Sequence, residues 1–190
     1  MSFMECYVRV DLGEETTVAA QLQNLGYEMV VFTFSSRLAS KITPDYRKKL
    51  ENTFDIPFLL ALDCEKPKDT KKKGFDRYLQ LGTRNKEFFP GVTHVYGNEF
   101  EPEKDFVHQR RSGLNHILLA QAKKKGIAVL LDLSLVLEAG VKRQAQLLGR
   151  MQQNAKLCRK AGVACGVAVL APVEKIPQAA DVAAFSRLLQ

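Results

Sequence analysis

Basic side chains dominate residues 104–125, where six lysines and arginines stand against a single acid. Two arginines come directly before an expected helix, and the free N–H groups at a helix start bind phosphate well. A histidine stands one turn into that helix, where it can donate to the same anion or to a nucleobase. These residue types and spacings predict contacts to a polyanion. The candidate contacts are Arg110, Arg111, His116, Lys123, Lys124 and Lys125.

The whole chain is basic as well, with 28 Lys and Arg against 21 Asp and Glu, a net charge of +7 and a pI near 9.3. Such a surplus favours polyanionic partners, although the charge of a basic protein can be incidental. Other interpretations stay open for each part. His116 can bond to its own loop, and the three lysines can be a solvated helix end. Lys71, Lys72 and Lys73, in the lysine-rich residues 66–73, are expected to form a flexible RNA-tracking or solubilising loop rather than a specific site.

Residues suited to metal or nucleophilic chemistry are sparse. His94 lies in an expected strand, and Asp11 and Asp132 fall near strand ends, which makes a thin set of ligands for a hydrolytic metal site. We favour the alternative, that these are scattered polar residues at strand rims. The sequence has no GxSxG, P-loop or GxGxxG motif. It therefore predicts neither catalytic residues nor a protein-bound metal.

Cysteine usage and hydropathy indicate the compartment. None of the four cysteines forms a CxxC pair, so neither a zinc knuckle nor a disulfide framework is indicated, and core packing is expected. The apolar runs are far short of a membrane span, and the N-terminus has no basic-then-apolar signal region. We therefore expect a cytoplasmic protein that makes no membrane contact.

A helix-strand unit must position the basic residues. Ser112 is a good N-cap for a helix with apolar residues at helical spacing, and Gly126 is placed to end it. The apolar run 127–133 then reads as a strand that is buried on both faces of a parallel sheet. This unit would carry a basic loop at its head and a lysine cluster at its tail.

The same alternation of strand and helix runs through the chain. We expect strands at 6–12, 28–34, 56–62, 78–81, 92–96, 127–133 and 163–170. We expect helices at 14–25, 44–53, 112–126, 141–161 and 179–189, a helical turn or two at 84–89, and polar loops at 63–75 and 98–111. This order predicts one α/β domain over residues 1–190 with a mainly parallel sheet, either an incomplete barrel or an open doubly wound sheet.

Residues 112–137 and 142–163 carry a family resemblance. They read SGLNHILLAQAKKKGIAVLLDLSLVL and KRQAQLLGRMQQNAKLCRKAGV, and they resemble protein component 3 of archaeal ribonuclease P. The shared pattern is a Gly-hydrophobe-Asn-His motif that opens a lysine-ended helix, then an apolar strand, then a helix that begins with an arginine. The matching residues are Gly113, Leu114, Asn115, His116, Ala128, Leu133, Arg143, Leu147, Leu148 and Leu157.

The resemblance implies an incomplete TIM-like barrel, related to the PHP metal-hydrolase barrels but without their metal ligands. It implies a non-catalytic subunit: the ribonuclease P RNA would cleave the 5′ leader from precursor tRNA, using Mg²⁺ held by the RNA and no cofactor on the protein. A small ferredoxin-like protein subunit would be its partner. By motif match, Asn115 and Arg143 join the expected RNA contacts.

Two function classes therefore follow from the sequence. The first is the RNA-binding subunit of this endoribonuclease. The alternative is a PHP-type metal-dependent phosphoesterase, which would need more histidines at strand ends than the three in the chain.

Overall fold

Seven parallel strands form one sheet, in which every strand pairs with its neighbour in the chain. The computed structural model describes residues 6–54, 56–82, 87–100, 104–105 and 110–189. The strands are β1 (Cys6–Arg9), β2 (Val30–Ser35), β3 (Phe58–Asp63), β4 (Arg77–Leu81), β5 (His94–Tyr96), β6 (Ala128–Asp132) and β7 (Cys165–Ala168). A doubly wound sheet reverses its strand order at a switch point, and this sheet does not. The fold is therefore a TIM-like α/β barrel.

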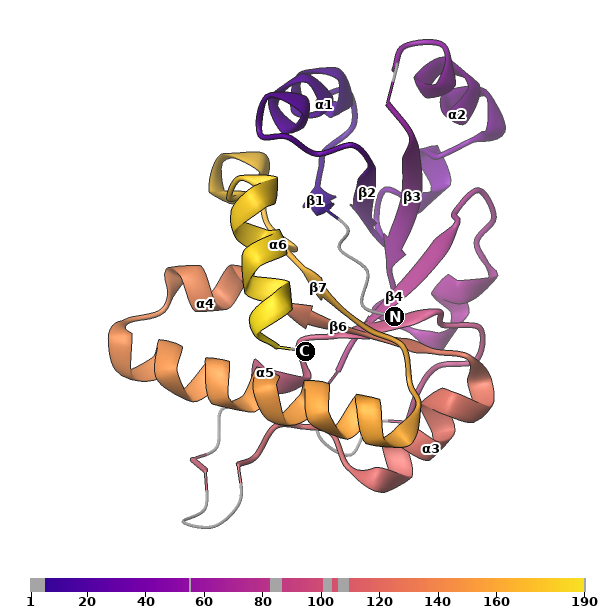
Figure 1. Ribbon diagram of the computed structural model, residues 1–190. Coiled ribbons are helices and arrows are strands. Elements are labelled where there is room, and N and C mark those ends of the chain that lie inside the picture. Colours follow the sequence, from indigo (N-terminus) through magenta and orange to yellow (C-terminus); the bar gives the residue numbers. More distant parts are fainter. Residues whose placement is uncertain (1–5, 55, 83–86, 101–103, 106–109, 190) are drawn as a thin grey trace.

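The helices lie outside the strands, as Figure 1 shows. They are α1 (Glu15–Asn24), α2 (Pro44–Glu51), α3 (His116–Lys125), α4 (Ser134–Glu138), α5 (Val141–Ala161) and α6 (Ala179–Leu188). Short 3₁₀ turns add η1 (Ala39–Lys41), η2 (Pro67–Lys71), η3 (Asn98–Phe100) and η4 (Val173–Lys175). Among the described residues, no helix is both long and apolar enough to cross a bilayer.

The barrel is nearly closed between its first and last strands. Val8 in β1 forms a parallel bridge with Ala171, just beyond β7. The amide of Arg9 donates to the carbonyl oxygen of Ala171 at 3.2 Å. The sheet therefore wraps round on itself, which an open sheet would not do.

Two apolar layers hold the barrel, because side chains alternate between the faces of a strand. The larger layer fills the space between strands and helices. The smaller fills the barrel interior, with Tyr7, Val31, Ala61, Leu79, Tyr96, Leu130, Ala168 and Leu170. Both strand faces are thus buried, which explains the nearly unbroken apolar runs in the sequence.

All seven expected strands are present, each shorter than or close to its expected range. The helix expected at 141–161 has those bounds, but the one expected from Ser112 begins only at His116. The turn expected at 84–89 is not helical at residues 87–89, and residues 84–86 lie outside the described part. Within the expected loop 63–75, residues Pro67–Lys71 fold as η2.

Candidate nucleic-acid interface

Asn115, and not Ser112, caps helix α3. The Asn115 side-chain oxygen accepts from the amide of Leu118 at 2.9 Å. Ser112 is buried instead, and its hydroxyl accepts from the side-chain amide of Gln153 at 3.0 Å. Between them Gly113 adopts a positive φ of 79°, in a place where a Cβ would collide with the Asn98 backbone. The sequence prediction for Ser112 was wrong because this tight turn must be completed before the helix can start.

The head cluster lies at the start of α3 and of α5. It consists of Arg110, Arg111, Asn115, His116 and Arg143. Arg110 and His116 are exposed, while Arg111 and Arg143 are half-buried. The Arg110 guanidinium rests on α5, where a side chain in place of Gly149 would collide with it. Asn115 is already engaged as the helix cap.

Asp105 and Arg150 organise the head cluster from beneath. Arg150 is fully buried in α5, and its Nη2 lies 2.8 Å from Oδ1 of Asp105. The same carboxylate accepts from the amide of Arg111 at 2.9 Å. Burial of Asp105 opposes its ionisation, but these bonds and the Arg150 charge outweigh it, so the pKa of Asp105 lies below its ordinary value. The Asp105 carboxylate thereby fixes the backbone at Arg111, next to the exposed Arg110.

Arg143 is held close to the same network. Its Nη1 donates to Gln146 at 2.5 Å, and its Nη2 donates to the carbonyl of Phe100 at 3.5 Å. Burial and the nearby charge of Arg150 lower the pKa of Arg143 from its ordinary value. This arginine is therefore oriented by the protein rather than free in solvent.

The three lysines of the sequence prediction lie at the opposite end of α3. All are exposed, and Gly126 ends the helix with a positive φ of 66°. Lys125 donates to the carbonyl of Phe88 at 3.3 Å. Ten residues of helix separate head and tail by about 15 Å. The expected basic head and lysine tail are thus both present, at opposite edges of the barrel.

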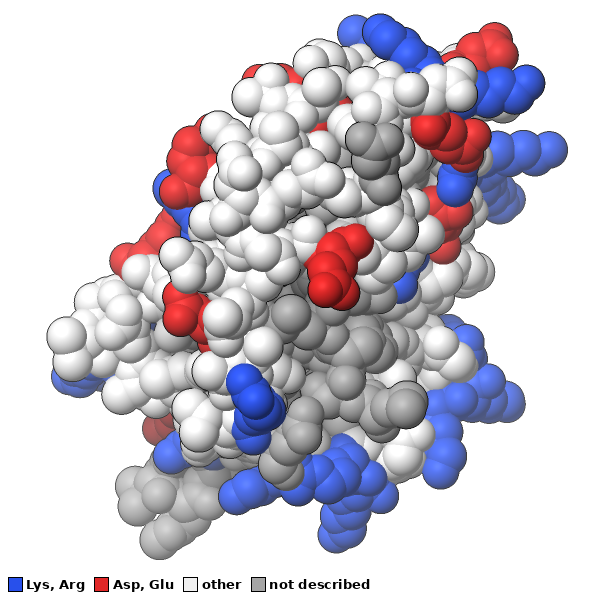
Figure 2. All heavy atoms as spheres, turned by 45° about the horizontal axis from the view of Figure 1, so that its top comes forward, with Lys and Arg blue, Asp and Glu red and all other residues white. Residues whose placement is uncertain are grey.

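Helix α5 extends the lysine tail, a contribution that the sequence prediction missed. The end of α5 lies beside the end of α3, since a Cβ on Gly162 would stand 3.3 Å from Nζ of Lys123. We call the exposed basic residues of both helix ends the tail cluster, which consists of Lys123, Lys124, Lys125, Lys156, Arg159 and Lys160. No acid occurs between residues 139 and 173, a signal that was present in the sequence. In Figure 2, Lys and Arg gather along the lower edge and again at the upper right, whereas Asp and Glu lie mainly over the upper half.

The lysine-rich residues 66–73 are more ordered than a mobile loop. Asp69 is buried, and its carboxylate accepts from the amides of Glu65 and Lys66 at 3.1 and 3.0 Å. Lys72 pairs with Asp69 at 2.9 Å and donates to the carbonyl of Ser36 at 2.8 Å. This segment thus neutralises part of its own charge.

The structure separates His94 from the two carboxylates weighed with it as metal ligands. His94 begins β5, whereas Asp132 ends β6 and Asp11 follows the end of β1, so the histidine lies towards the opposite end of the barrel from both. Nδ1 of His94 is 2.9 Å from the hydroxyl of Thr93. Within the described ranges, no group of three or more His, Cys, Asp or Glu side chains is placed to hold a metal ion. His108 lies outside the described residues.

One buried carboxyl group behind the head cluster, that of Glu99, was not indicated by the sequence. Glu99 is fully buried, and its Oε1 accepts from the amide of Asp132 at 2.7 Å. Burial, with the nearby charge of Asp132, raises the pKa of Glu99 to about 8. Burial also raises the pKa of Asp132. Glu99 stands in a stretch that reads as a polar loop, so no pattern in the sequence distinguishes it from a surface acid.

The expected core packing of the cysteines is largely confirmed. Cys6, Cys64 and Cys158 are buried free thiols, while Cys165 is half-buried. Tyr96, an aromatic residue of a type that can stack on bases, is buried within the barrel. Its hydroxyl donates to Asp63 at 2.8 Å.

Comparisons with known proteins give a match in structure but not in sequence. No protein-family model and no curated protein matches the chain. A chain of an archaeal ribonuclease P, solved by cryo-EM with mature tRNA, superposes with a TM-score of 0.68 over 97% of this chain and 82% of that one, at 16% identity. A dihydropteroate synthase from Xanthomonas albilineans reaches a TM-score of only 0.40, at 14% identity over 98% of this chain and 88% of that one.

Proposed function

We propose that this chain is an RNA-binding protein component of ribonuclease P. The observation that carries the proposal is the tail cluster, six exposed cations on two helices that contain no carboxylate. The fold likeness to a chain of archaeal ribonuclease P supports the choice of RNA. The RNA would remove the 5′ leader of precursor tRNA, and the protein would make or break no bond.

The mechanism is electrostatic positioning. Each lysine or arginine that contacts a phosphate releases condensed counterions, which lowers the cost of compacting a folded RNA. Folded RNA is recognised largely by shape and backbone, so the protein would not read a sequence. The proposed contacts are Arg110, Arg111, Asn115 and His116 at the head, Arg143 beside them, and Lys123, Lys124 and Lys125 at the tail. The structure adds Lys156, Arg159 and Lys160 to this proposal.

The rest of the assembly belongs to the same proposal. Mg²⁺ would be held by the RNA, precursor tRNA would be the substrate, and a small ferredoxin-like protein would be the second subunit. The assembly would act in the cytoplasm. Its archaeal character rests on the sequence resemblance.

The first test is the salt dependence of RNA binding. Replacing Lys123, Lys124 and Lys125 together by Gln should lower the magnitude of the slope of log K against log salt by about two to three units, because each phosphate contact contributes about 0.9. The matched control replaces Lys41, Lys48 and Lys49, three exposed lysines outside α3 and α5, and should change the slope by less than about one unit. Equal slopes for the two variants would remove the tail cluster from the interface.

The second test is reconstitution. A candidate archaeal ribonuclease P RNA is assayed for precursor-tRNA cleavage at limiting Mg²⁺, alone, with this protein, and with this protein and a ferredoxin-like subunit. Cleavage should increase on adding protein and should require the RNA. Phosphoester cleavage by the protein without RNA would contradict the non-catalytic role and favour the phosphoesterase alternative.

A further inference from the structure

A cavity opens at the carboxyl edge of β1, β2 and β3. It has a volume of about 360 Å³ and is lined by residues at or just after these strand ends, including Arg9, Asp11, Glu14, Thr33 and Asp63. Small-molecule sites commonly occupy about 300–1,000 Å³. In TIM-like barrels this edge is where the loops that bind ligands converge. The RNA contacts proposed above do not use it.

The charge of the cavity is opposite to that of the chain. Among the described residues that line it, three carboxylates (Asp11, Glu14 and Asp63) face one cation, Arg9. Arg9 is already matched, because its Nη2 lies 3.8 Å from Oδ2 of Asp63. Glu14 accepts only a 3.3 Å bond from the Asp11 amide in the described structure. An acidic hollow in a protein of net charge +7 would repel phosphate and attract a cation.

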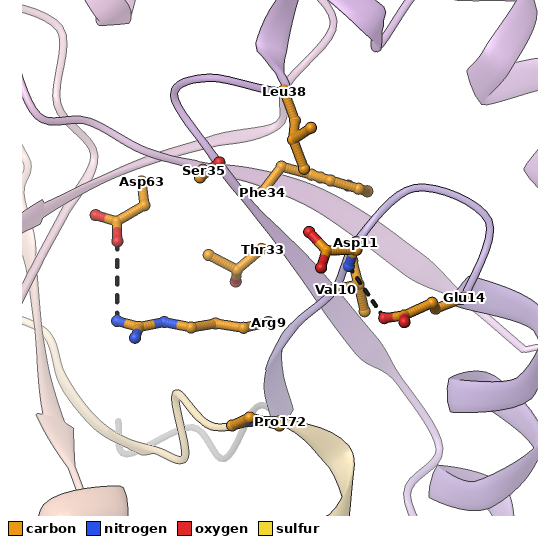
Figure 3. Close-up of a pocket in the computed structure, with 10 residues that line it drawn as sticks. All are labelled: Arg9, Val10, Asp11, Glu14, Thr33, Phe34, Ser35, Leu38, Asp63 and Pro172. Carbon is orange, nitrogen blue, oxygen red and sulfur yellow. Dashed lines mark hydrogen bonds and ion pairs between the residues drawn. The ribbon is translucent and has the colours of Figure 1, made fainter.

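A buried hydroxyl points to a ligand independently of the charge. Thr33 is 2% exposed, and its Oγ1 has no hydrogen-bond partner among the described residues. In Figure 3 its side chain lies between the Arg9–Asp63 ion pair and the Asp11 carboxylate. A buried hydroxyl without a hydrogen-bond partner is unfavourable, and a bound donor would remove that cost.

Metal binding does not account for this arrangement. The described carboxylates of the cavity do not form a group that could hold a metal ion. They are spread around the hollow, whereas ammonium groups separated by a short carbon chain can reach several acceptors at once. An ammonium group has three donors and no acceptor, which matches carboxylates and a vacant hydroxyl oxygen.

We propose that this cavity is a binding site for a small organic cation that carries ammonium groups. Asp11 and Glu14 would bind the charged ends, Thr33 would accept one further hydrogen bond, and the Arg9–Asp63 pair would form the far wall. The apolar side chains of Phe34 and Leu38 would contact the carbon chain.

Titration calorimetry of the full chain with 1,4-diaminobutane tests the proposal. The diamine should bind, while 1,4-butanediol, which has the same chain length and no charge, should not. Asp11→Asn combined with Glu14→Gln should weaken diamine binding by at least about tenfold. The matched control, Glu28→Gln with Glu87→Gln, changes two exposed carboxylates that precede β2 and β5 and should leave the affinity unchanged.

The variant Thr33→Val distinguishes specific diamine binding from non-specific electrostatic attraction, because it removes the hydroxyl but keeps the side-chain shape and every charge. It should weaken the diamine by several-fold while the circular dichroism spectrum stays that of the wild type. The proposal is overturned if the diamine gives no binding at millimolar concentration, or if Thr33→Val binds it as tightly as the wild type does. Equal weakening by the control pair would also overturn it, since it would indicate non-specific cation condensation. RNA binding should not change in any of these variants, so this result is independent of the proposed RNA function.

Discussion

At the scale of single residues, Arg150 is a buried cation that stabilises the interior, whereas other basic residues of α5 are exposed on the surface. It is fully buried, and its guanidinium contacts the Asp105 carboxylate and the Glu99 carbonyl. In the sequence it looks like any basic residue on the polar side of a long helix. Periodicity could not identify it, because the loop that buries it comes from a segment 45 residues away.

Asp105→Asn should therefore be strongly destabilising. Removing one partner of a buried ion pair costs about 3–5 kcal/mol, and the partly exposed Asp105 side chain puts the expectation near 3 kcal/mol in urea unfolding. Arg47→Gln, which breaks exposed pairs with Asp76 and Glu51, is the comparison and should cost about 1 kcal/mol or less. A loss of the same size in both variants would show that Arg150 is solvated in solution.

Glu99 should make the folded protein less stable as the pH rises from about 5 to 8. Its pKa is raised to about 8 in the folded protein, so between about 4.5 and 8 the unfolded chain releases a proton that the folded chain retains. The contribution of Glu99 is therefore full below the unfolded pKa and falls as pH rises towards 8. Urea unfolding at pH 5 and pH 8 should show a loss of stability in the wild type that is smaller in Glu99→Gln. A parallel loss in the two proteins would assign the pH dependence to other groups.

At the scale of elements, helix α3 shows what the sequence could predict and what it could not. Its apolar periodicity, its lysine end and Gly126 predicted the existence and the end of the helix. Its beginning was misplaced because Ser112 and Asn115 are both good caps by residue type. Only the close approach of Gly113 to Asn98 decides between them, and this contact joins segments that the sequence does not relate.

Asn115→Ala should cost about 1 kcal/mol of stability, because the amide of Leu118 loses its acceptor. Asn115→Asp retains an acceptor oxygen and should stay within a few tenths of a kcal/mol of the wild type. The midpoint of urea unfolding measures both. A wild-type midpoint for Asn115→Ala would indicate that the α3 cap is dispensable.

At the scale of the whole molecule, alternating strands and helices predicted an α/β fold but left barrel and open sheet undecided. The choice depends on which strands pair, and apolar runs look alike in both architectures. The candidate RNA contacts could be predicted from the sequence as basic residues. Their division between two edges of the barrel, and the contribution of α5, could be seen only once the packing of the helices was known. Charge is a property of the sequence, whereas a charged surface exists only once the helices pack side by side.

Because head and tail lie about 15 Å apart, beyond a Debye length of about 8 Å at physiological salt, they should act independently on RNA. Arg110→Gln in the head cluster should weaken binding by an amount that adds to the effect of replacing Lys123, Lys124 and Lys125 by Gln, within about 0.5 kcal/mol. Filter binding of the combined variant measures this. If the combined variant is no weaker than either parent, the two clusters do not both contact the RNA.

The closure of the barrel has a mechanical consequence. Neighbouring strands share at least three register pairs, but among the described residues the first strand meets the far end through the Val8–Ala171 bridge alone. This bridge is therefore the weakest pairing around the barrel. Fluctuations that separate β1 from Ala171 would admit water to the barrel interior without breaking any other strand pair. The packing of α3 against α5 does not involve β1 or Ala171, so it would persist while the bridge opens.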